Sequence, residues 1–532
     1  MQKLFRLHST NIGLIIFAII LVFGISLTYS FVSLDDYRHL HDNPAMSEFS
    51  FENLKSIWSK SYFGMYAPVT YTVWSGQMAF AKWLGGDEIP SAVFHFGSVL
   101  LHTLNTILVY FLLQRLGLRK TYAVIAALIF SLHPVQVESV TWVSSFRDLL
   151  AAFWGLLFLN GLMHAISSEG HKLLRSLYLG LFLLFALLSK PSAVVFVPLA
   201  ILCFSTLRIK PQKVESLWLA VWALMAIAVT MIAKTIQPDN SVDLVPVFSD
   251  RILLSLHALS VYAQKIFWPV GLTPDYGLSP LFVLNSWQKE GFAYGTFILA
   301  LLGVTSALWF TYRNKSWAQG LLFALIALVP YSGFIIFNFQ NVSTIADRYL
   351  YISMIGIAWC ISSILASPRW PQKLGVVFGA LAIMTLAGIS FQQNSIWKND
   401  ETLFTHMLQS NPRSFYGYGG LGNLLLVQGK TNEALPLLQK AVELRPTYPQ
   451  ALTNIGRVFE LQGKPQEALP KYIQAINIDP NFVGAYISLA DLLVRAGRLA
   501  EARETVAHGF TIAPNSRELH DIWKDIEAKQ QK

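Results

Sequence analysis

The sequence predicts an all-α protein in which a polytopic membrane domain precedes a soluble α-solenoid. Charged residues make up 13% of the 532 residues and hydrophobic residues 54%, whereas a soluble globular chain is about 25% charged. Uncharged apolar runs that are long enough to cross a bilayer recur through the first part of the chain. From about residue 395 the composition becomes that of a soluble domain, and residues recur with a fixed period. The predicted domains are therefore residues 1–394 and 395–532.

Eleven apolar segments are predicted to span the membrane. They are residues 11–33, 91–114, 121–134, 148–166, 173–189, 191–207, 215–235, 292–311, 317–337, 347–366 and 374–391. Lys and Arg gather in short gaps between these segments, and such gaps face the cytoplasm. This rule places the N-terminus inside, and the C-terminus and the loops 34–90 and 236–290 outside. The apolar segment 251–268 contains charged residues, so we expect a re-entrant or surface helix there.

Other features of the composition exclude simpler interpretations. No small-residue cleavage site directly follows the first span, so we expect that span to stay uncleaved. The net charge of +9 comes largely from basic residues beside the apolar runs, and therefore indicates topology and not a nucleic-acid partner. Cys203 and Cys360 each lie inside an apolar run, which disfavours a structural disulfide.

The C-terminal part contains a repeat of 34 residues. The positions that keep this spacing are Pro412, Pro446, Pro480 and Pro514; Gly429, Gly463 and Gly497; Ala434, Ala468 and Ala502; and Gly422, Gly456 and Ala490. Small residues where two helices cross, with Pro closing the second helix, resemble the tetratricopeptide repeat. We predict repeats at 413–446, 447–480 and 481–514, a half repeat at 397–411 and a capping helix at 515–530. Stacked repeats of this kind form a concave surface that commonly binds a peptide or protein. The alternative is that the repeats form a stabilising lid without a ligand.

Two adjacent carboxylates, Asp35 and Asp36, directly follow the first span in the stretch FVSLDDYRHLHDNP. A carboxylate beside apolar surface tends to have a raised pKa, as a general base needs. The alternative is that the pair only ends the span. His39, His41 and Asp42 add atoms that can bind a metal, but their spacing matches no defined metal site, so a divalent ion is a weak candidate.

A second polar group follows the third span in HPVQVESVTWVSSFRDLL. Ser145 and Asp148 have the spacing of a capping box that starts a helix. Arg147 then lies in the first turn at the outer interface, close to His133 and Glu138. The alternative role for Arg147 is a salt bridge with Asp148 or Glu138.

Lys190 and Arg348 are also basic residues at the predicted outer surface. Each could simply extend its charged end to the interface. Three cations at one depth, counting Arg147, could instead hold a lipid phosphate, because Lys and Arg stabilise phosphate charge as it departs.

These stretches have the order and spacing of a known family. The chain resembles the transmembrane and tetratricopeptide-repeat (TMTC-like) proteins and looks like a short, bacterial-type member of the GT-C superfamily of membrane glycosyltransferases. The most specific part is HPVQVES…SSFRDLL followed by SKP. Further matching stretches are FVSLDDYRHLHDNP, YAPVTYTVW, ADRYLYISMIG and SIWKNDETLFTHMLQSNP.

The resemblance implies an activity. Such enzymes move a sugar from a polyprenyl-phosphate carrier to an acceptor hydroxyl and use an acidic residue of the first external loop as the base. That residue would be Asp36 or Asp35, with Asp36 slightly favoured. A single displacement would invert the anomeric carbon, and the repeats would recruit a protein acceptor.

The resemblance also implies a phosphate site, formed by Arg147, Lys190 and Arg348. The residues expected to support it are His133, Glu138, Asp148, Tyr351 and His102. No cofactor is required besides the lipid-linked sugar donor, and metal dependence stays open.

Two other functions stay open. A non-catalytic membrane anchor could display the repeats as a scaffold, or a transporter could carry a lipid-linked sugar. Ionisable residues at the ends of the spans disfavour a transporter, which places them near the midplane. We expect a bacterial inner membrane, with the site and the repeats facing the periplasm; an endoplasmic reticulum membrane facing the lumen would have equivalent topology.

Overall fold

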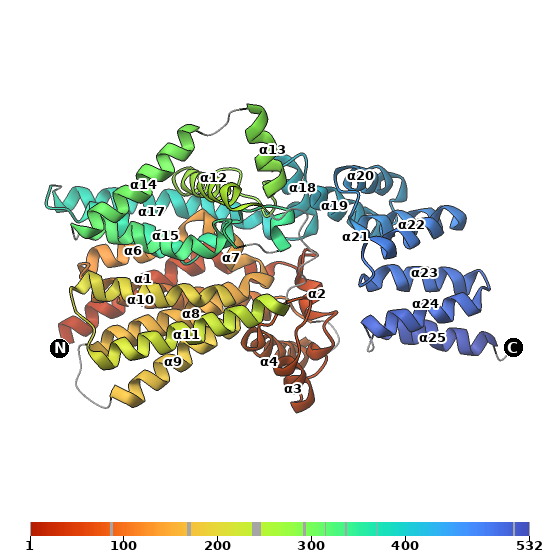
Figure 1. Ribbon diagram of the computed structural model, residues 1–532, viewed down its shortest axis with the longest axis horizontal. Coiled ribbons are helices and arrows are strands. Elements are labelled where there is room, and N and C mark those ends of the chain that lie inside the picture. Colours follow the sequence, from red (N-terminus) through yellow and green to blue (C-terminus); the bar gives the residue numbers. More distant parts are fainter. Residues whose placement is uncertain are drawn as a thin grey trace. The chain divides into compact units, whose positions relative to one another are not determined.

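The computed structural model describes residues 2–85, 89–166, 172–236, 246–290, 294–313, 315–335, 338–369, 371–513 and 516–530. These residues form two compact units, Met1–Lys398 and Asn399–Lys532. All regular elements of the described ranges are helices (Figure 1). The all-α class predicted from the sequence is confirmed.

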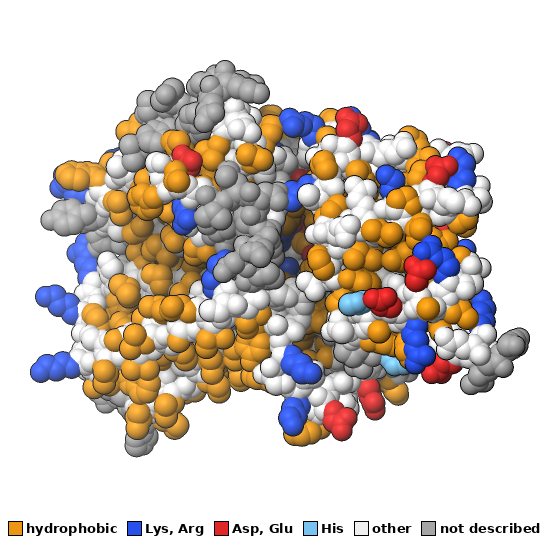
Figure 2. Space-filling model, turned by 45° about the vertical axis from the view of Figure 1, so that its right-hand side comes forward, with side chains coloured by type: hydrophobic (Ala, Val, Ile, Leu, Met, Phe, Trp, Pro, Cys, Tyr) orange, Lys and Arg blue, Asp and Glu red, His pale blue; other side chains and the backbone are white. Residues whose placement is uncertain are grey.

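The first unit is a bundle of apolar helices that run roughly parallel (Figure 1). Five helices are long and apolar enough to cross a membrane: His8–Thr28, Ala92–Arg115, Val143–Ile166, Lys213–Ile236 and Gln372–Trp397. The bent pair Lys120–Leu132 and Pro134–Thr141 can form one more span. Shorter apolar helices cover Leu173–Ser189, Pro191–Leu207, Leu302–Thr311, Ser316–Tyr331 and Ser353–Leu365. Hydrophobic side chains form a broad band on this unit, with Lys and Arg side chains at its end (Figure 2). The chain is a membrane protein.

The helices of this unit have the following bounds. They are α1 (Gln2–Phe23), α5 (Ala92–Arg115), α6 (Lys120–Leu132), α7 (Val137–Thr141), α8 (Phe146–Ile166), α9 (Lys172–Ser189), α10 (Phe196–Leu207), α11 (Lys213–Ile236), α12 (Phe248–Phe267), α13 (Pro280–Glu290), α14 (Tyr294–Tyr312), α15 (Ser316–Leu328), α16 (Ser353–Leu365) and α17 (Gln372–Asn394). Part of the predicted loop 236–290, residues 237–245, lies outside the described residues.

Three predicted spans contain breaks. α6 ends before Pro134, and the chain bends by 54° into the next helical segment. α15 ends at Leu328 and continues as a 3-10 turn through Pro330. Proline lacks the N–H that a continuing α-helix requires, which explains both ends. The predicted span 347–366 is α-helical only from Ser353, because residues 347–350 form a separate 3-10 turn.

The predicted external loop 34–90 folds onto the bundle. It contains α2 (Asp36–Leu40), α3 (Phe51–Ser59) and α4 (Pro68–Gly85), and residues 86–88 lie outside the described ranges. Its buried Leu40, Ile57 and Trp74 pack in one cluster with Phe94 at the start of α5 and Phe146 at the start of α8. This packing places the start of α2 at the end of the bundle where α8 begins.

The second unit is a series of antiparallel helix pairs. Its helices are α18 (Asp400–Ser410), α19 (Phe415–Val427), α20 (Thr431–Leu444), α21 (Pro449–Leu461), α22 (Pro465–Ile478), α23 (Val483–Arg495), α24 (Leu499–Ile512) and α25 (Arg517–Gln530). Gly429, Gly463 and Gly497 turn the chain within each pair at φ angles of 77°, 74° and 75°, where glycine is favoured. A Cβ on Gly456 would lie 2.4 Å from the ring of Tyr472, so the helices can pack this closely only with glycine there. Residues 514 and 515, at the predicted start of the capping helix, are outside the described ranges.

Candidate functional site

The predicted site residues gather at one end of the bundle. Asp35 and Asp36 lie at the start of α2, and Arg147 and Asp148 lie in the first turn of α8. Lys190 lies between α9 and the 3-10 helix η5 (Pro191–Val195). The 3-10 helix η9 (Asp347–Leu350) contributes Arg348. Residues far apart in the sequence therefore form one charged cluster.

Asp36 is a buried carboxylate whose two oxygens both accept hydrogen bonds. Its Oδ1 accepts from the Ser144 hydroxyl at 2.6 Å and from the Ser144 N–H at 3.0 Å. Its Oδ2 accepts from the Val32 N–H at 3.1 Å. Burial raises the pKa of Asp36 to about 7, and these hydrogen bonds oppose the rise. Asp36 therefore fixes the start of α2 to the turn Val143–Ser145 that precedes α8.

Asp35 is half-buried, and no hydrogen bond or salt bridge to another described residue engages its carboxylate. Burial raises the pKa of Asp35, while the charges of Arg147, Arg38 and Arg348 oppose the rise. The two neighbouring aspartates thus have different environments. The carboxylate of Asp35 can accept a proton from a substrate without first losing a protein partner.

Arg147 faces Asp35 without forming a salt bridge to any described carboxylate. Its guanidinium donates to the sulfur of Met65 in the first external loop, and its buried Nε has no hydrogen-bond partner in the part of the chain that the structure describes. The expected capping box is wrong, because the Ser145 hydroxyl has no hydrogen-bond partner among the residues that the structure describes, and the chain forms a 3-10 turn at Val143–Ser145. The alternative salt bridges of Arg147 do not form either, because both candidate carboxylates bind other cations.

Lys190 pairs with Asp148. The ammonium nitrogen lies 2.5 Å from Asp148 Oδ1, and only 16% of the Lys190 side chain is exposed. The ammonium also lies 5.2 Å and 5.6 Å from the ring centres of Tyr331 and Tyr349, which stack on each other at 4.1 Å. Burial lowers the pKa of Lys190 to about 8, and the Asp148 charge opposes this change. Lys190 is thus held by a carboxylate and two aromatic faces and does not extend into the interface.

Arg348 is the most enclosed of the three cations, with 6% of its side chain exposed. Its guanidinium binds Glu138, and its backbone N–H also donates to Glu138 at 3.1 Å. The rings of Phe339, Tyr349 and Trp142 lie 4.3 Å, 4.9 Å and 5.2 Å from the guanidinium carbon. Removing one partner of such a buried pair strongly destabilises the folded protein, because the other charge stays buried without compensation. Tyr349 contacts both Arg348 and Lys190, and so connects the two ion pairs.

His133 lies beside this pair but has a separate contact. Its Nε2 donates to the carbonyl of Ile266 at the end of α12 at 2.9 Å. The neighbouring Asp347 accepts a hydrogen bond from the Tyr276 hydroxyl at 2.7 Å. These two contacts attach the end of α12 and the segment that follows it to this end of the bundle.

His102 and Tyr351 form a polar group within the bundle. The His102 Nδ1 lies 2.8 Å from the Tyr351 hydroxyl, and the Asn105 amide donates to the same hydroxyl at 3.1 Å. The other nitrogen of His102 donates to the carbonyl of Ser131 at 3.1 Å. These contacts join α5, α6 and the turn before α16, and the Tyr351 backbone N–H also donates to the carbonyl of Arg348 at 3.3 Å. Both residues therefore support the bundle beside the charged cluster.

The weak metal candidates do not gather. His39 is buried, with its Nδ1 3.1 Å from the Tyr71 hydroxyl and its ring 5.8 Å from that of Trp74. Burial lowers the pKa of His39 well below its usual value. His41 and Asp42 are exposed. In the described ranges no group of three His, Cys, Asp or Glu side chains is arranged to hold a metal ion.

Several residues of the cluster were missed in the sequence, namely Ser144, Tyr276, Tyr331, Tyr349 and Asp347. Ser144 and Asp347 lie directly beside predicted residues, within VSSFRDLL and ADRYLYISMIG, and this proximity is the only signal that could have identified them. Tyr349 is likewise adjacent to Arg348 in that stretch. Tyr276 and Tyr331 carry no such signal, because aromatic residues are common throughout this chain.

Comparisons with known proteins agree with both parts of the chain. Tetratricopeptide-repeat profiles match residues 415–481 and 459–522, which confirms the predicted repeats. The chain is 23% identical over 78% of its length to protein O-mannosyl-transferase F38B6.6 of Caenorhabditis elegans. It is 27% identical over 39% of its length to protein O-mannosyl-transferase TMTC1 of Homo sapiens. The predicted resemblance to TMTC proteins is confirmed.

The chain covers only part of these relatives, 60% of the C. elegans protein and 24% of the human one. Among solved structures, the oligosaccharyltransferase of Archaeoglobus fulgidus matches 72% of this chain and 53% of its own chain, with 15% identity and a TM-score of 0.39.

Proposed function

We propose that the protein is a membrane glycosyltransferase that moves a sugar from a polyprenyl-phosphate carrier to an acceptor hydroxyl. The observation that carries this proposal is the pair of Asp35 and Arg147. Among the described residues, the half-buried Asp35 carboxylate has no hydrogen-bond or salt-bridge partner and faces an arginine that forms no salt bridge, at the end of a membrane helix. The sequence similarity to protein O-mannosyl-transferases supports the same reaction class.

Asp35 is the base in this proposal, although the sequence slightly favoured Asp36. A general base must be free to receive the proton of the acceptor hydroxyl. Asp36 already accepts three hydrogen bonds, whereas the carboxylate of Asp35 accepts none from described residues. Asp36 instead positions Asp35, because the hydrogen bonds from Ser144 hold the start of α2 against α8.

The deprotonated acceptor oxygen attacks the anomeric carbon while the bond from that carbon to the phosphate oxygen breaks. Because this is a single displacement, the configuration of the anomeric carbon inverts. The lipid phosphate leaves with the electron pair, and no acid is required. Arg147 stabilises the departing phosphate, because its guanidinium forms no salt bridge with a described carboxylate. Lys190, whose side chain is 16% exposed, contributes its positive charge beside Asp148, and Arg348 acts mainly as a structural partner of Glu138.

The repeats recruit the protein acceptor in this proposal. Stacked helix pairs present a continuous surface suited to an extended peptide, and the profile matches place such repeats at 415–522. The site and the repeats face the non-cytoplasmic side, with a bacterial inner membrane favoured. The acceptor is a hydroxyl side chain on a protein.

The test uses the purified full chain in nanodiscs that contain its native membrane lipids. Radiolabelled polyprenyl-phosphate sugars are added with a peptide library rich in Ser and Thr, and donor binding and peptide labelling are recorded. The proposal predicts labelled peptide whose anomeric configuration is opposite to that of the donor, as determined by NMR. Retained configuration would contradict the single displacement. Absence of donor binding would contradict the enzyme and favour a non-catalytic scaffold.

A further inference from the structure

A tight turn in the first external loop carries an exposed aromatic ring. Tyr62 and Met65 pair in antiparallel fashion, with N···O distances of 3.0 Å and 2.9 Å, and Phe63 and Gly64 form the turn between them. Both turn residues have positive φ angles, 51° for Phe63 and 67° for Gly64. Turns of this kind favour Asn, Asp or Gly at the first position, and a bulky residue is an outlier there. The backbone at Phe63 is therefore strained.

Packing does not explain why phenylalanine occupies this position. Phe63 is 55% exposed, so its ring adds little buried area. The Arg38 guanidinium lies 4.2 Å from the ring centre, and a cation over an exposed ring stabilises a protein only weakly. Asparagine would relieve the strain and lose little packing. Strained residues cluster at sites that bind ligands or substrates, which makes this ring a candidate for binding.

The turn contacts both members of the carboxylate–arginine pair or their immediate neighbours. At one end, the sulfur of Met65 accepts a hydrogen bond from the Arg147 guanidinium. At the other, the Phe63 ring lies on the side chain of Arg38. Asp35 and Arg38 are three positions apart at the start of α2 and therefore share one face of that helix. The exposed ring thus lies beside the pair.

Other aromatic side chains hold the turn in place. The Tyr62 hydroxyl donates to the Arg38 carbonyl at 3.0 Å. The buried ring of His39 lies 6.5 Å from the Tyr62 ring and 6.3 Å from the Phe63 ring. The Tyr62 ring also packs edge-on against that of Tyr71, at 6.2 Å. Phe63 is therefore presented by a fixed framework, as a precise binding surface requires.

The position of the ring indicates which part of a substrate it meets. In the proposed reaction, Asp35 receives the proton of the acceptor and Arg147 holds the phosphate, so the sugar lies between them. The face of a sugar ring presents C–H groups, which carry a small positive charge. The face of an aromatic ring is negative and apolar, and it packs favourably against such groups. An exposed phenylalanine beside the pair therefore suits a sugar.

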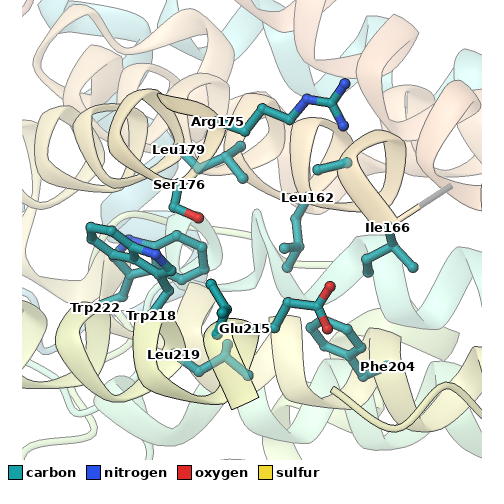
Figure 3. A pocket seen from close by; sticks show the side chains of 12 residues that line it. Leu162, Ile166, Arg175, Ser176, Leu179, Phe204, Glu215, Trp218, Leu219 and Trp222 are labelled. Carbon is teal, nitrogen blue, oxygen red and sulfur yellow. The ribbon is translucent and has the colours of Figure 1, made fainter. Parts of the chain in front are cut away.

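A cavity at the other end of α8 does not suit a sugar. Figure 3 shows side chains that line it, among them Leu162, Leu179 and Trp222. The space open to the centre of a water-sized sphere is about 40 Å³, which accommodates only a few water molecules. A sugar ring is larger than this space, so the open surface beside Phe63 is the better candidate.

We propose that Phe63 binds the sugar of the lipid-linked donor, with its exposed ring packed against a C–H face of that sugar. The inference rests on the proposed function, because it requires a lipid-linked sugar at Asp35 and Arg147. It assigns Phe63 to donor binding and not to the chemical step.

Titrations with and without the sugar test this proposal. Polyprenyl-phosphate mannose, polyprenyl-phosphate glucose and polyprenyl phosphate of the same chain length are titrated into the purified full chain in nanodiscs. Three variants are compared with wild type. Phe63→Asn removes the ring and fits the left-handed backbone, and Phe63→Trp keeps an aromatic face. Phe51→Asn is the matched control, because Phe51 lies in the same loop and is 81% exposed. Thermal unfolding is recorded for each protein.

Wild type is expected to bind at least one sugar lipid more tightly than polyprenyl phosphate. Phe63→Asn should weaken binding of that sugar lipid roughly tenfold, the size of one aromatic contact, and leave binding of polyprenyl phosphate unchanged. Phe63→Trp and Phe51→Asn should bind both ligands as wild type does. Because asparagine relieves the strain, Phe63→Asn should unfold at or above the wild-type temperature, whereas loss of a structurally required ring would lower it.

Unchanged affinity of Phe63→Asn for the sugar lipid would overturn the proposal and leave the proposed function intact. An equal loss of affinity for polyprenyl phosphate would also overturn it, because the ring would then contact the lipid and not the sugar. Wild type that binds neither sugar lipid in preference to polyprenyl phosphate would contradict the proposed function together with this inference.

Discussion

The hydrogen bonds on Asp36 predict an energetic coupling between Asp36 and Ser144 that changes with pH. A hydrogen bond to a charged acceptor contributes ~1.5–3 kcal/mol, and one between neutral groups about 1 kcal/mol. Because burial raises the pKa of Asp36 to about 7, the stronger form of the bond exists above that pH and the weaker form below it. Ser144→Ala should therefore lower the free energy of unfolding by about 2 kcal/mol at about pH 8.5, and by about 1 kcal/mol at about pH 5.5.

The assay is a double-mutant cycle with Asp36→Asn, in which denaturant unfolding in detergent is followed by tryptophan fluorescence. The amide introduced at position 36 does not ionise, so in the Asp36→Asn background Ser144→Ala should lower the free energy of unfolding by the same amount at both pH values. The folded-state pKa of Asp36 exceeds its ordinary value of 3.8. Its contribution to stability is therefore fully present below about pH 4 and declines as the pH rises toward 7, and Asp36→Asn should remove this decline. A coupling that is the same at both pH values would refute the assignment of these hydrogen bonds.

Three further predictions concern other parts of the chain. Glu138→Gln leaves Arg348 buried without its carboxylate and should lower the free energy of unfolding by about 3–5 kcal/mol. Arg147→Gln breaks no salt bridge to a described carboxylate and should lower it far less. Equal losses of unfolding free energy in the two variants would contradict this difference. Gly456→Ala should destabilise the repeats by about 1–3 kcal/mol, because its Cβ would lie 2.4 Å from Tyr472. Limited proteolysis of the full chain measures this destabilisation. The control is Gly388→Ala, whose Cβ would have no atom within 4 Å. Turnover should rise with pH as Asp35 ionises. The midpoint of this pH dependence should move to higher pH in Arg147→Gln, because the Arg147 charge lowers the pKa of Asp35. An unchanged midpoint would exclude Asp35 as the titrating base.

The sequence predicted the helical class, the membrane segments and the repeats because each depends on local patterns. Apolar runs identify spans without knowledge of their neighbours, and the 34-residue period identifies the helix pairs. The ends of the spans were less predictable. The predicted span 347–366 included residues 347–352, yet Asp347 and Arg348 bind Tyr276 and Glu138 from distant parts of the chain.

The partners within the charged cluster could not be predicted for the same reason. Asp148 and Glu138 are the nearest carboxylates to Arg147 in the sequence, but they bind Lys190 and Arg348, 42 and 210 residues away. Nor does the sequence distinguish Asp35 from Asp36. Only the position of Ser144, 108 residues away from Asp36, shows that one aspartate is engaged and the other is available.

The most direct measurement compares single-turnover rates of Asp35→Asn and Asp36→Asn with saturating lipid-linked donor and a labelled acceptor. Donor binding is measured in parallel for both variants and for wild type. With donor still bound, Asp35→Asn should slow the chemical step by about 10²–10⁴-fold, the usual contribution of a general base. Asp36→Asn should retain a larger part of the rate, because it disturbs only the position of Asp35. A rate in Asp35→Asn close to that of wild type, or a folded Asp36→Asn that binds donor and is the slower of the two, would contradict the assignment of Asp35 as the base.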